Sequence, residues 1–296
     1  RRLLADGHTE LDGAADVAVV NTCCVTHEAV RKSRHAASRA ARTHRRVYVT
    51  GCGASLAADG FAGLPENVVV VARRSEETPA VVARDVGAVG CVKADARRDR
   101  VRAFVKVQDG CSFSCAFCVI PQVRGASRSR SADAVVREVR RRVEQGHREV
   151  VLTGINLGCY RDRAAGYGLP RLVRAVGAVP GLMRLRLSSI EINHVSRELE
   201  AALRETPAVA HHLHVPLQSG DDGVLRAMGR RYAAVTFLRR LERFGDFNLT
   251  TDVIVGFPAE DEVAFRRTLA VLEGGGLTKV HVFPYSPRPG TATAAA

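Results

Sequence analysis

Three cysteines, Cys111, Cys115 and Cys118, lie close together in the run Cys-Ser-Phe-Ser-Cys-Ala-Phe-Cys, a C-x3-C-x2-C pattern. Thiolate sulfur is a soft ligand that favours zinc and iron–sulfur clusters. A structural zinc site normally needs four ligands in two pairs, and the sequence has no second C-x2-C pair. Three thiolates on a short loop suit a 4Fe–4S cluster in which one iron has no protein ligand. Buried apolar cysteines are the alternative, but thiols this close together would attract a metal in any case.

The elements around this loop alternate between short β-branched runs and longer helical stretches, and the cysteines directly follow one such run and a Gln-Asp-Gly turn. Strands separated by helical segments of 10–15 residues are typical of βαβ units and a parallel sheet. We expect strands at 17–20, 47–50, 68–71, 103–107, 149–153, 185–188, 211–215, 249–255 and 279–284. We expect helices at 28–42, 78–86, 132–145, 169–176, 196–204, 235–244 and 262–273.

The distribution of these elements predicts an α/β protein of two domains. Residues 1–95 contain about three β–α units, enough for a small open α/β domain. A charged break at 95–102 marks the expected boundary, and residues 96–296 carry six strand signals. This second part predicts a partial (β/α)6 barrel, because a closed barrel would need eight repeats.

Basic residues outnumber acidic ones, 44 to 31, in a chain of 296 residues, which gives a formal net charge of +13. Such an excess indicates a polyanionic partner such as nucleic acid, or else a coding bias toward alanine and arginine. No stretch approaches the roughly 20 apolar residues that span a bilayer, and residues 1–16 are too polar for a secretory signal. We therefore expect a cytoplasmic protein, where thiols stay reduced and a cysteine cluster favours metal over disulfides.

The C-x3-C-x2-C loop after the first strand of a barrel resembles that of the radical S-adenosylmethionine (SAM) enzymes. The resemblance implies a 4Fe–4S cluster held by Cys111, Cys115 and Cys118, whose open iron binds the amino and carboxylate groups of SAM. Electron transfer into the sulfonium would then yield a 5′-deoxyadenosyl radical. The cofactor supplies the reactivity, while the protein supplies position and exclusion of water.

Further motifs resemble the methylthiotransferases within that group, in order along nearly the whole chain. They lie at 20–23, 32–34, 50–54, 120–125, 128–130, 214–220, 228–232 and 252–258. The resemblance implies an auxiliary 4Fe–4S cluster bound by Cys23 and Cys52, whose third ligand lies in the family before the first residue of this chain. It also implies that the chain is truncated at both ends, without the family's carboxyl-terminal RNA-binding β-barrel. Cys24, Cys91 and Cys159 are interpreted as buried or incidental thiols.

A SAM pocket is expected beyond the carboxyl ends of the barrel strands, where ligands bind in such folds. Gly154 would allow close approach of the methionyl end of SAM. Arg230 offers a bidentate fork for its carboxylate. The remaining expected cofactor-binding residues are Glu191 or Ser189 for the ribose hydroxyls, Phe117 for the adenine and Gln218 at a strand end.

The motifs at 153–160, 187–191 and 281–291 are most similar to the branch that modifies N6-threonylcarbamoyladenosine in tRNA. The implied reaction places a methylthio group on C2 of this adenosine beside the anticodon, and it needs two SAM molecules and an unidentified electron donor. Arg124, Arg128 and Arg130 follow the cysteine loop and are expected to contact tRNA phosphates.

Two other functions remain open from the sequence alone. One is methylthiolation of isopentenyladenosine in tRNA or of an aspartate in a ribosomal protein. The other is a non-catalytic iron–sulfur or zinc protein that binds nucleic acid, although the polar motifs at the strand ends disfavour it, because a binding module needs no such pocket.

Overall fold

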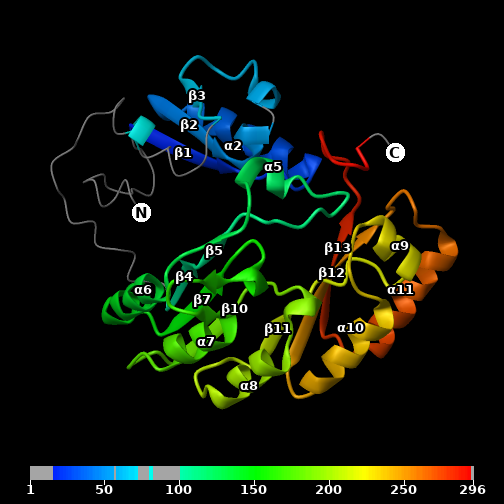
Figure 1. The fold of residues 1–296 in the computed structure, drawn as a ribbon. Coiled ribbons are helices and arrows are strands. Elements are labelled where there is room, and N and C mark those ends of the chain that lie inside the picture. The colour runs from blue at the N-terminus through cyan, green and yellow to red at the C-terminus, as the bar shows by residue number, and fades with distance from the viewer. Residues whose placement is uncertain (1–15, 57, 73–79, 83–100, 295–296) are drawn as a thin grey trace. The chain divides into compact units, whose positions relative to one another are not determined.

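The computed structural model describes residues 16–56, 58–72, 80–82 and 101–294 (Figure 1), and all structural statements concern these residues. The chain divides into two compact units, which are described separately. The amino-terminal unit comprises Arg1–Ala96, Cys118–Arg124 and Ser286–Ala294, and the barrel unit comprises Arg97–Phe117, Gly125–Tyr285 and Ala295–Ala296. The expected boundary at 95–102 lies largely outside the described residues and stays a prediction.

The amino-terminal unit is built on a parallel sheet in the order β1-β2-β3, as its three β-branched runs predict. Helix α2 begins where the Thr26 hydroxyl accepts a hydrogen bond from the amide of Ala29 at 3.1 Å. One face of α2 packs on a small core that includes Ala37, Val47 and Val49. The bounds are β1 Val17–Thr22, α2 His27–Ala41, β2 Arg46–Gly51, α3 Cys52–Leu56 and β3 Val68–Val70. Most of the expected helix at 78–86 lies outside the described residues.

The barrel unit contains two parallel three-stranded sheets, β10-β7-β4 and β11-β12-β13, with a single parallel bridge between Leu185 and Val209 at their junction. Figure 1 shows the helices of this unit on the outside of the strands. The strands are β4 Arg102–Lys106, β7 Glu149–Thr153, β10 Arg184–Leu187, β11 His212–His214, β12 Asn248–Val255 and β13 Lys279–Pro284. The expected partial barrel of six strands is confirmed.

The outer helices begin at polar caps and turn an apolar stripe toward the strands. Ser131, Ser196 and Asp261 each accept a hydrogen bond from an amide in the first turn of α6, α8 and α11. The helices are α6 Ala132–Glu144, α7 Leu169–Gly177, α8 Arg197–Glu205, α10 Ala234–Leu241 and α11 Glu262–Gly274. The sequence did not predict the short helices α3, α5 (Ile120–Arg124) and α9 (Asp222–Ala227). It also did not predict the antiparallel pair of β5 (Gln108–Asp109) with β6 (Arg128–Ser129), or the hairpin of β8 (Arg161–Asp162) with β9 (Tyr167–Gly168).

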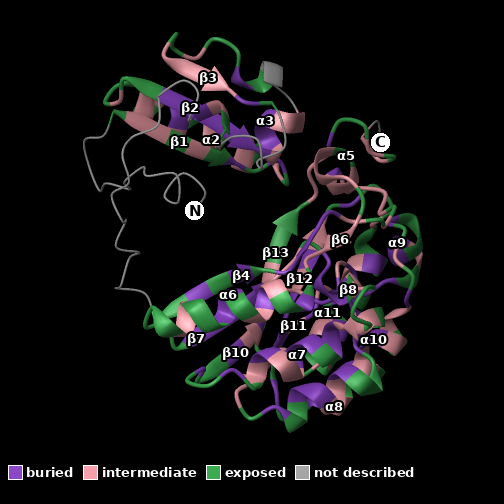
Figure 2. Ribbon diagram, turned by 60° about the vertical axis from the view of Figure 1, so that its left-hand side comes forward, coloured by how far each residue is buried: buried purple, intermediate pink, exposed green. Residues whose placement is uncertain are grey.

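Side chains alternate between two different environments along the barrel strands. On β4, Ala103 and Val105 are buried in the main core with residues of α6 and α7, whereas Arg102, Phe104 and Lys106 are exposed. Figure 2 colours each residue of the ribbon by its burial. The apolar side of each strand therefore faces the helices. The opposite side, called the inner face below, carries charged residues such as Arg102 and Lys106 together with the exposed Phe104.

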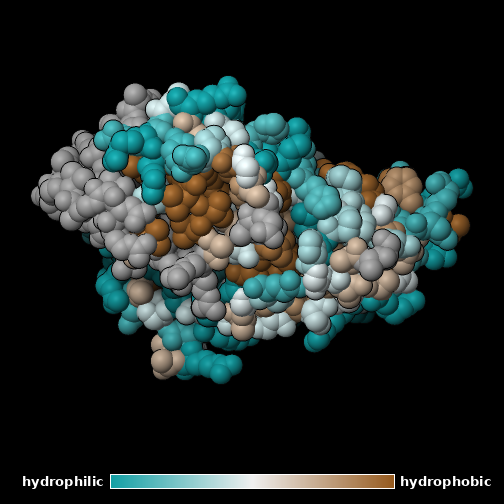
Figure 3. Space-filling model, turned by 90° about the horizontal axis from the view of Figure 1, so that it is seen from above, coloured by the Kyte–Doolittle hydropathy of each residue, from teal (hydrophilic) through white to brown (hydrophobic). Residues whose placement is uncertain are grey.

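In the face seen in Figure 3, hydrophilic residues surround a smaller hydrophobic area. No helix among the described residues is long and apolar enough to cross a membrane.

Candidate functional site

The cysteine loop starts from a turn that only glycine can make. Gly110 has a φ of +68°, and a β carbon there would overlap the carbonyl oxygen of Ala126. The buried Gln108 amide donates to the carbonyl oxygens of Asp109 at 3.0 Å and Gly110 at 2.7 Å. The amide of Cys111 then donates to the carbonyl of Gly125 at 3.0 Å. These bonds fix the direction in which the loop leaves the strand.

The loop is held a second time, at the segment that follows α9. The amide of Ala116 donates to the carbonyl of Met228 at 2.9 Å. The next residue, Gly229, has a φ of +73° and lies against the backbone of Ser114 and Cys115. Two distant parts of the chain are thereby brought together beside the thiol of Cys115.

Arg230 brings a positive charge to this thiol. Its Nη1 lies 3.6 Å from Sγ of Cys115, and its Nε lies 3.2 Å from the hydroxyl of Tyr232. Burial opposes the charge on Arg230, but Tyr232 and Cys115 raise its pKa above the ordinary value. Burial also raises the pKa of Tyr232 to about 12, so its hydroxyl stays protonated and donates to the carbonyl of Leu217 at 2.7 Å. The guanidinium is thus a fixed cation at the loop.

A cavity of about 200 Å³ adjoins this cation within the barrel unit. It brings together three of the residues that the sequence singled out: Cys115, Glu191 and Arg230. The Glu191 carboxylate accepts hydrogen bonds from the amide and the side chain of Asn193, at 3.0 and 3.1 Å. The cavity also has Phe113, Ser114, Asn193, His194, Gly229 and Arg231 in its wall.

The other expected cofactor-binding residues of the barrel unit lie outside the wall of this cavity. A β carbon on Gly154 would lie 2.8 Å from Oε1 of Gln108, so only glycine fits beside the buried amide. Phe117 packs edge-on against Phe257, with ring centroids 6.4 Å apart. Ser189 is half-buried in the segment after β10.

Gln218 also lies outside the cavity wall, but its backbone is unusual. It is the one non-glycine residue in the described part of the chain with a positive φ, +70°. Such a conformation in a side-chain-bearing residue is uncommon and concentrates at functional sites.

Sequence reasoning did not single out His194, which lines the cavity. Its ring stacks on Phe113 with centroids 5.9 Å apart, and its Nε2 lies 3.4 Å from Sγ of Cys159. Burial lowers the pKa of His194 and raises that of Cys159. Both groups are therefore neutral near pH 7, and Cys159 is a structural neighbour of the cavity.

In the amino-terminal unit, the strand ends bring three thiols close together. Cys23 follows β1, and Cys52 opens α3 directly after β2. The Thr22 hydroxyl donates to the carbonyl of Thr50 at 2.7 Å, which ties the two strand ends together. A hydrogen bond with Cys52, together with burial, raises the pKa of the Cys24 thiol. Cys24 is therefore a protonated neighbour of the two expected ligands.

The three arginines expected to contact RNA each have a partner within their own unit. Arg124 donates from Nε to Sγ of Cys52 at 3.0 Å. Arg128 lies 3.4 Å from Oδ2 of Asp109. Arg130 lies 2.7 Å from Oε2 of the buried Glu138. Any role of these residues toward RNA comes in addition to these contacts.

Family models and curated proteins match most of the chain. The model of the radical SAM superfamily matches residues 105–272, and that of the uncharacterized protein family UPF0004 matches residues 2–72. A threonylcarbamoyladenosine tRNA methylthiotransferase from Thermotoga maritima is 35% identical over 95% of this chain and 68% of its own length. The enzyme of the same name from Chlamydia pneumoniae is 36% identical, over 93% of this chain and 66% of its own length.

Solved structures share the fold at low sequence identity. The radical SAM methyltransferase TsrM from Kitasatospora setae, with cobalamin and a [4Fe-4S] cluster bound, has a TM-score of 0.69 at 15% identity and covers 96% of this chain and 66% of that one. The cobalamin-dependent radical SAM enzyme OxsB has a TM-score of 0.61 at 10% identity, over 87% of this chain and 43% of that one. At these identities the likeness establishes the fold alone.

Proposed function

Because the chain belongs to the radical SAM superfamily and, within it, to the tRNA methylthiotransferases, we propose that it adds a methylthio group to C2 of N6-threonylcarbamoyladenosine beside the anticodon. The names of the relatives support the choice of adenosine. The observation that carries the proposal is the cavity that joins Cys115, Glu191 and Arg230, because it sets a thiol, a carboxylate and a cation around one small space.

The cysteine loop fits a 4Fe–4S cluster. Cys111, Cys115 and Cys118 are half-buried and in no disulfide, and three thiolates leave one iron for SAM. A cluster bound there would supply the electron that cleaves the sulfonium of SAM. The chain's own part is to hold the loop through Gly110, Gly125 and Met228 and to keep a cation beside it.

In this proposal, the cavity residues orient SAM. The Arg230 guanidinium, held by Tyr232, would bind the SAM carboxylate through two parallel hydrogen bonds. Glu191 would accept hydrogen bonds from ribose hydroxyls in addition to those from Asn193. Phe117, Gly154, Ser189 and Gln218 remain proposed contacts for the rest of the molecule.

The amino-terminal unit would hold the sulfur that is transferred. Cys23 and Cys52 are proposed ligands of the auxiliary 4Fe–4S cluster, at the carboxyl ends of neighbouring strands. One SAM would donate its methyl group to a sulfur there, and a second would be cleaved to activate C2–H of the adenine. The substrate tRNA implies a cytoplasmic reaction, with Arg124, Arg128 and Arg130 as proposed phosphate contacts.

The test is anaerobic reconstitution of the protein with iron and sulfide, followed by incubation with SAM, dithionite and tRNA that carries N6-threonylcarbamoyladenosine. We expect nuclease digestion and mass spectrometry to show the 2-methylthio derivative of that nucleoside. We also expect release of 5′-deoxyadenosine, and Cys115→Ala should abolish both products.

Two results would contradict the proposal. Methylthiolation of isopentenyladenosine or of a ribosomal protein, with none on threonylcarbamoyladenosine, would assign the enzyme to another branch. Failure of the reduced protein to release 5′-deoxyadenosine would favour a non-catalytic nucleic-acid-binding protein.

A further inference from the structure

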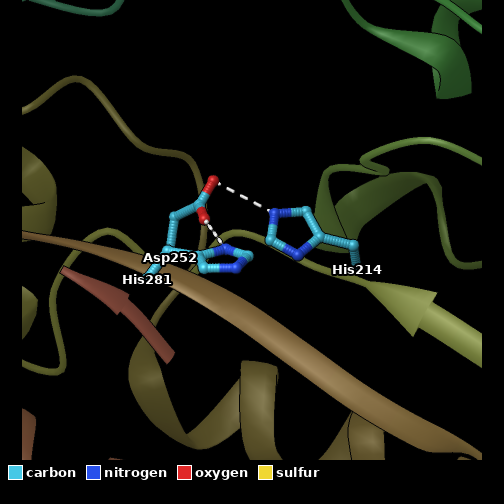
Figure 4. Close-up of side chains that lie close together, drawn as sticks. All are labelled: His214, Asp252 and His281. Atoms are coloured by element: carbon cyan, nitrogen blue, oxygen red, sulfur yellow. Dashed lines mark hydrogen bonds and ion pairs between the residues drawn. The ribbon is translucent and has the colours of Figure 1, made fainter. Parts of the chain in front are cut away.

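Three polar side chains meet on the inner face of the barrel unit, on three neighbouring parallel strands (Figure 4). His214 is the last residue of β11, Asp252 lies in β12 and His281 lies in β13. Oδ2 of Asp252 lies 3.1 Å from Nε2 of His214, and its Oδ1 lies 3.1 Å from Nδ1 of His281. One carboxylate therefore orients two imidazoles, and none of the three residues lines the cavity at the cysteine loop.

Strand register produces this arrangement. Asp252 and His281 are direct partners across β12 and β13, and His214 pairs with Thr250, two residues before Asp252. Leu249, Thr251 and Val253, which alternate with Thr250 and Asp252, are buried on the helix side. The three side chains thus share the inner face, at the carboxyl end of β11 and midway along β12 and β13.

The bonding pattern leaves one nitrogen ready for a ligand. Nδ1 of His214 forms a hydrogen bond with the hydroxyl of Thr250 at 2.9 Å. Nε2 of His281 has no hydrogen-bond partner among the described residues, and the His281 side chain is 42% exposed. Burial would raise the pKa of Asp252, but its bonds to the two histidines hold that pKa below its ordinary value. Asp252 is therefore an anchoring carboxylate, and the other ring nitrogen of His281 faces outward from it.

A basic cluster lies on the other sheet of the barrel unit, toward the amino-terminal ends of β4, β7 and β10. Glu149 on β7 is the shared partner of three arginines, Arg102 at 2.7 Å, Arg186 at 2.8 Å and Arg184 at 3.6 Å. One carboxylate cannot neutralise three guanidinium groups. Arg186 is close enough to β11 to add to burial in lowering the pKa of His212, the first residue of that strand. A positive inner face attracts an anionic group and opposes a metal cation.

We propose that His214, Asp252 and His281 form a binding subsite for the anionic substituent on N6 of the substrate adenosine, with His281 as the residue that contacts it. The inference rests on the proposed function, whose substrate carries a threonine carboxylate on this substituent. As an imidazolium, His281 donates from Nδ1 to Asp252 and from Nε2 to that carboxylate, and the basic cluster on the inner face supplies long-range attraction. Adenosine without the substituent makes neither interaction.

The experiment compares two anticodon stem-loop RNAs that differ only in carrying N6-threonylcarbamoyladenosine or plain adenosine. Their dissociation constants for the reconstituted protein with SAM are measured anaerobically by fluorescence anisotropy. We expect the wild type to bind the modified RNA at least tenfold more tightly. His281→Phe should reduce this preference to less than threefold, and His281→Gln, which keeps an N–H donor, should retain part of it.

The matched control is His211→Phe, an exposed histidine that stacks on Phe247 at a centroid distance of 4.6 Å on the outer side of the barrel unit. It should keep the wild-type preference. Thermal midpoints of all variants within about 3 °C of the wild type would exclude misfolding as the cause.

Three outcomes would overturn the subsite. The first is equal affinity of the wild type for both RNAs while it still forms the methylthio product, which leaves the proposed function intact. The second is an unchanged preference in His281→Phe. The third is a metal site: the three ligand atoms lie within 4.8 Å of one another, which would also suit a metal ion. One zinc per chain in the purified wild type, absent from His281→Phe and Asp252→Asn, would show that the residues bind a metal instead. Absence of methylthio product with the wild type would instead refute the proposed function.

Discussion

Gly229 leaves just enough room for Cys115: a β carbon on Gly229 would lie 3.5 Å from Cα of Cys115 and 3.1 Å from the carbonyl oxygen of Ser114. Its φ of +73° also favours glycine. We predict that Gly229→Ala shifts the cysteine loop and lowers the rate of 5′-deoxyadenosine release at least tenfold. The measurement is that rate in the reconstituted enzyme with saturating SAM.

Gly146 offers a matched control for this substitution. Its φ is +93°, but nothing lies within 4 Å of the position of its β carbon. Gly146→Ala should therefore show a similar backbone strain, on the order of 1 kcal/mol, without loss of SAM cleavage. Equal loss of activity in both variants would show that backbone strain, and not the contact with the loop, is responsible.

Arg230 is expected to determine SAM affinity. Arg230→Ala removes the cation that lies 3.6 Å from Sγ of Cys115, and we predict at least a tenfold rise in the KM for SAM. Arg230→Lys should recover only part of the affinity, because an ammonium cannot form two parallel hydrogen bonds to a carboxylate. Arg226→Ala, at an exposed position at the end of α9, is the control and should leave the KM unchanged. A normal KM in Arg230→Ala would remove this residue from the SAM site.

Asp221 should make folding stability depend on pH. It caps α9 through the amide of Val224 at 2.9 Å and pairs with Arg267 at 2.7 Å. The hydrogen bond from Arg267 is the main cause that lowers the pKa of Asp221 below its ordinary value. Because the folded state holds the pKa below the unfolded value of about 3.9, the stabilisation is complete above that pH. It is lost as the pH falls through the folded pKa.

Urea unfolding of the wild type and of Asp221→Asn at several pH values between about 2 and 6 would measure this effect. Asparagine can still cap the helix but cannot titrate, so the variant should lose less stability on acidification. Asp221→Ala should in addition lose about 1 kcal/mol at neutral pH, the usual value of a helix cap. Parallel curves for the wild type and Asp221→Asn would contradict the assignment.

Arg130 is predicted to contribute more to folding than to RNA binding. It bonds to the buried Glu138 at 2.7 Å and to the carbonyl of Lys106 at 2.8 Å. Arg130→Leu removes the closest partner of this buried carboxylate and leaves Arg142 at 3.5 Å, so we expect a loss of about 1–3 kcal/mol in the free energy of unfolding. The exposed Arg137→Leu should change it by less than about 0.5 kcal/mol.

The contribution of these arginines to RNA binding can be measured from the salt dependence of the binding constant K. If Arg128 contacts a phosphate, Arg128→Gln should reduce the slope of log K against log salt by about one. An unchanged slope for Arg128→Gln would show that Arg128 contacts no phosphate. A reduced slope with full stability for Arg130→Leu would show that Arg130 binds RNA and is not needed for folding.

The sequence predicted the strands well because each is a compact β-branched run between helical stretches. All nine expected strands are present, with bounds that differ by at most two residues at either end. The short helices α3, α5 and α9 escaped prediction, because five or six residues are too few to show helical periodicity. Their positions depend on tertiary contacts such as that between Gly229 and the cysteine loop.

The candidate site was predictable where residues lie close together in the chain, as in the cysteine loop. The site was less predictable where its residues come from separate strands. Glu191 and Arg230 could be named from motifs, but their common cavity with Cys115 could not be derived. The contact of Asp252 with both histidines depends on the register of three strands, and the pairing of Arg130 with Glu138 depends on how α6 packs.

The alternation along the barrel strands has an evolutionary consequence. Stability resides in the apolar residues between strands and helices, so exchanging a residue such as His281 opens no void in that packing. If His281 contacts the substrate as proposed, changes on the inner face can alter substrate choice while the packing of the strands on the helices persists. A family with this architecture can diversify its substrates without having to reinvent its fold.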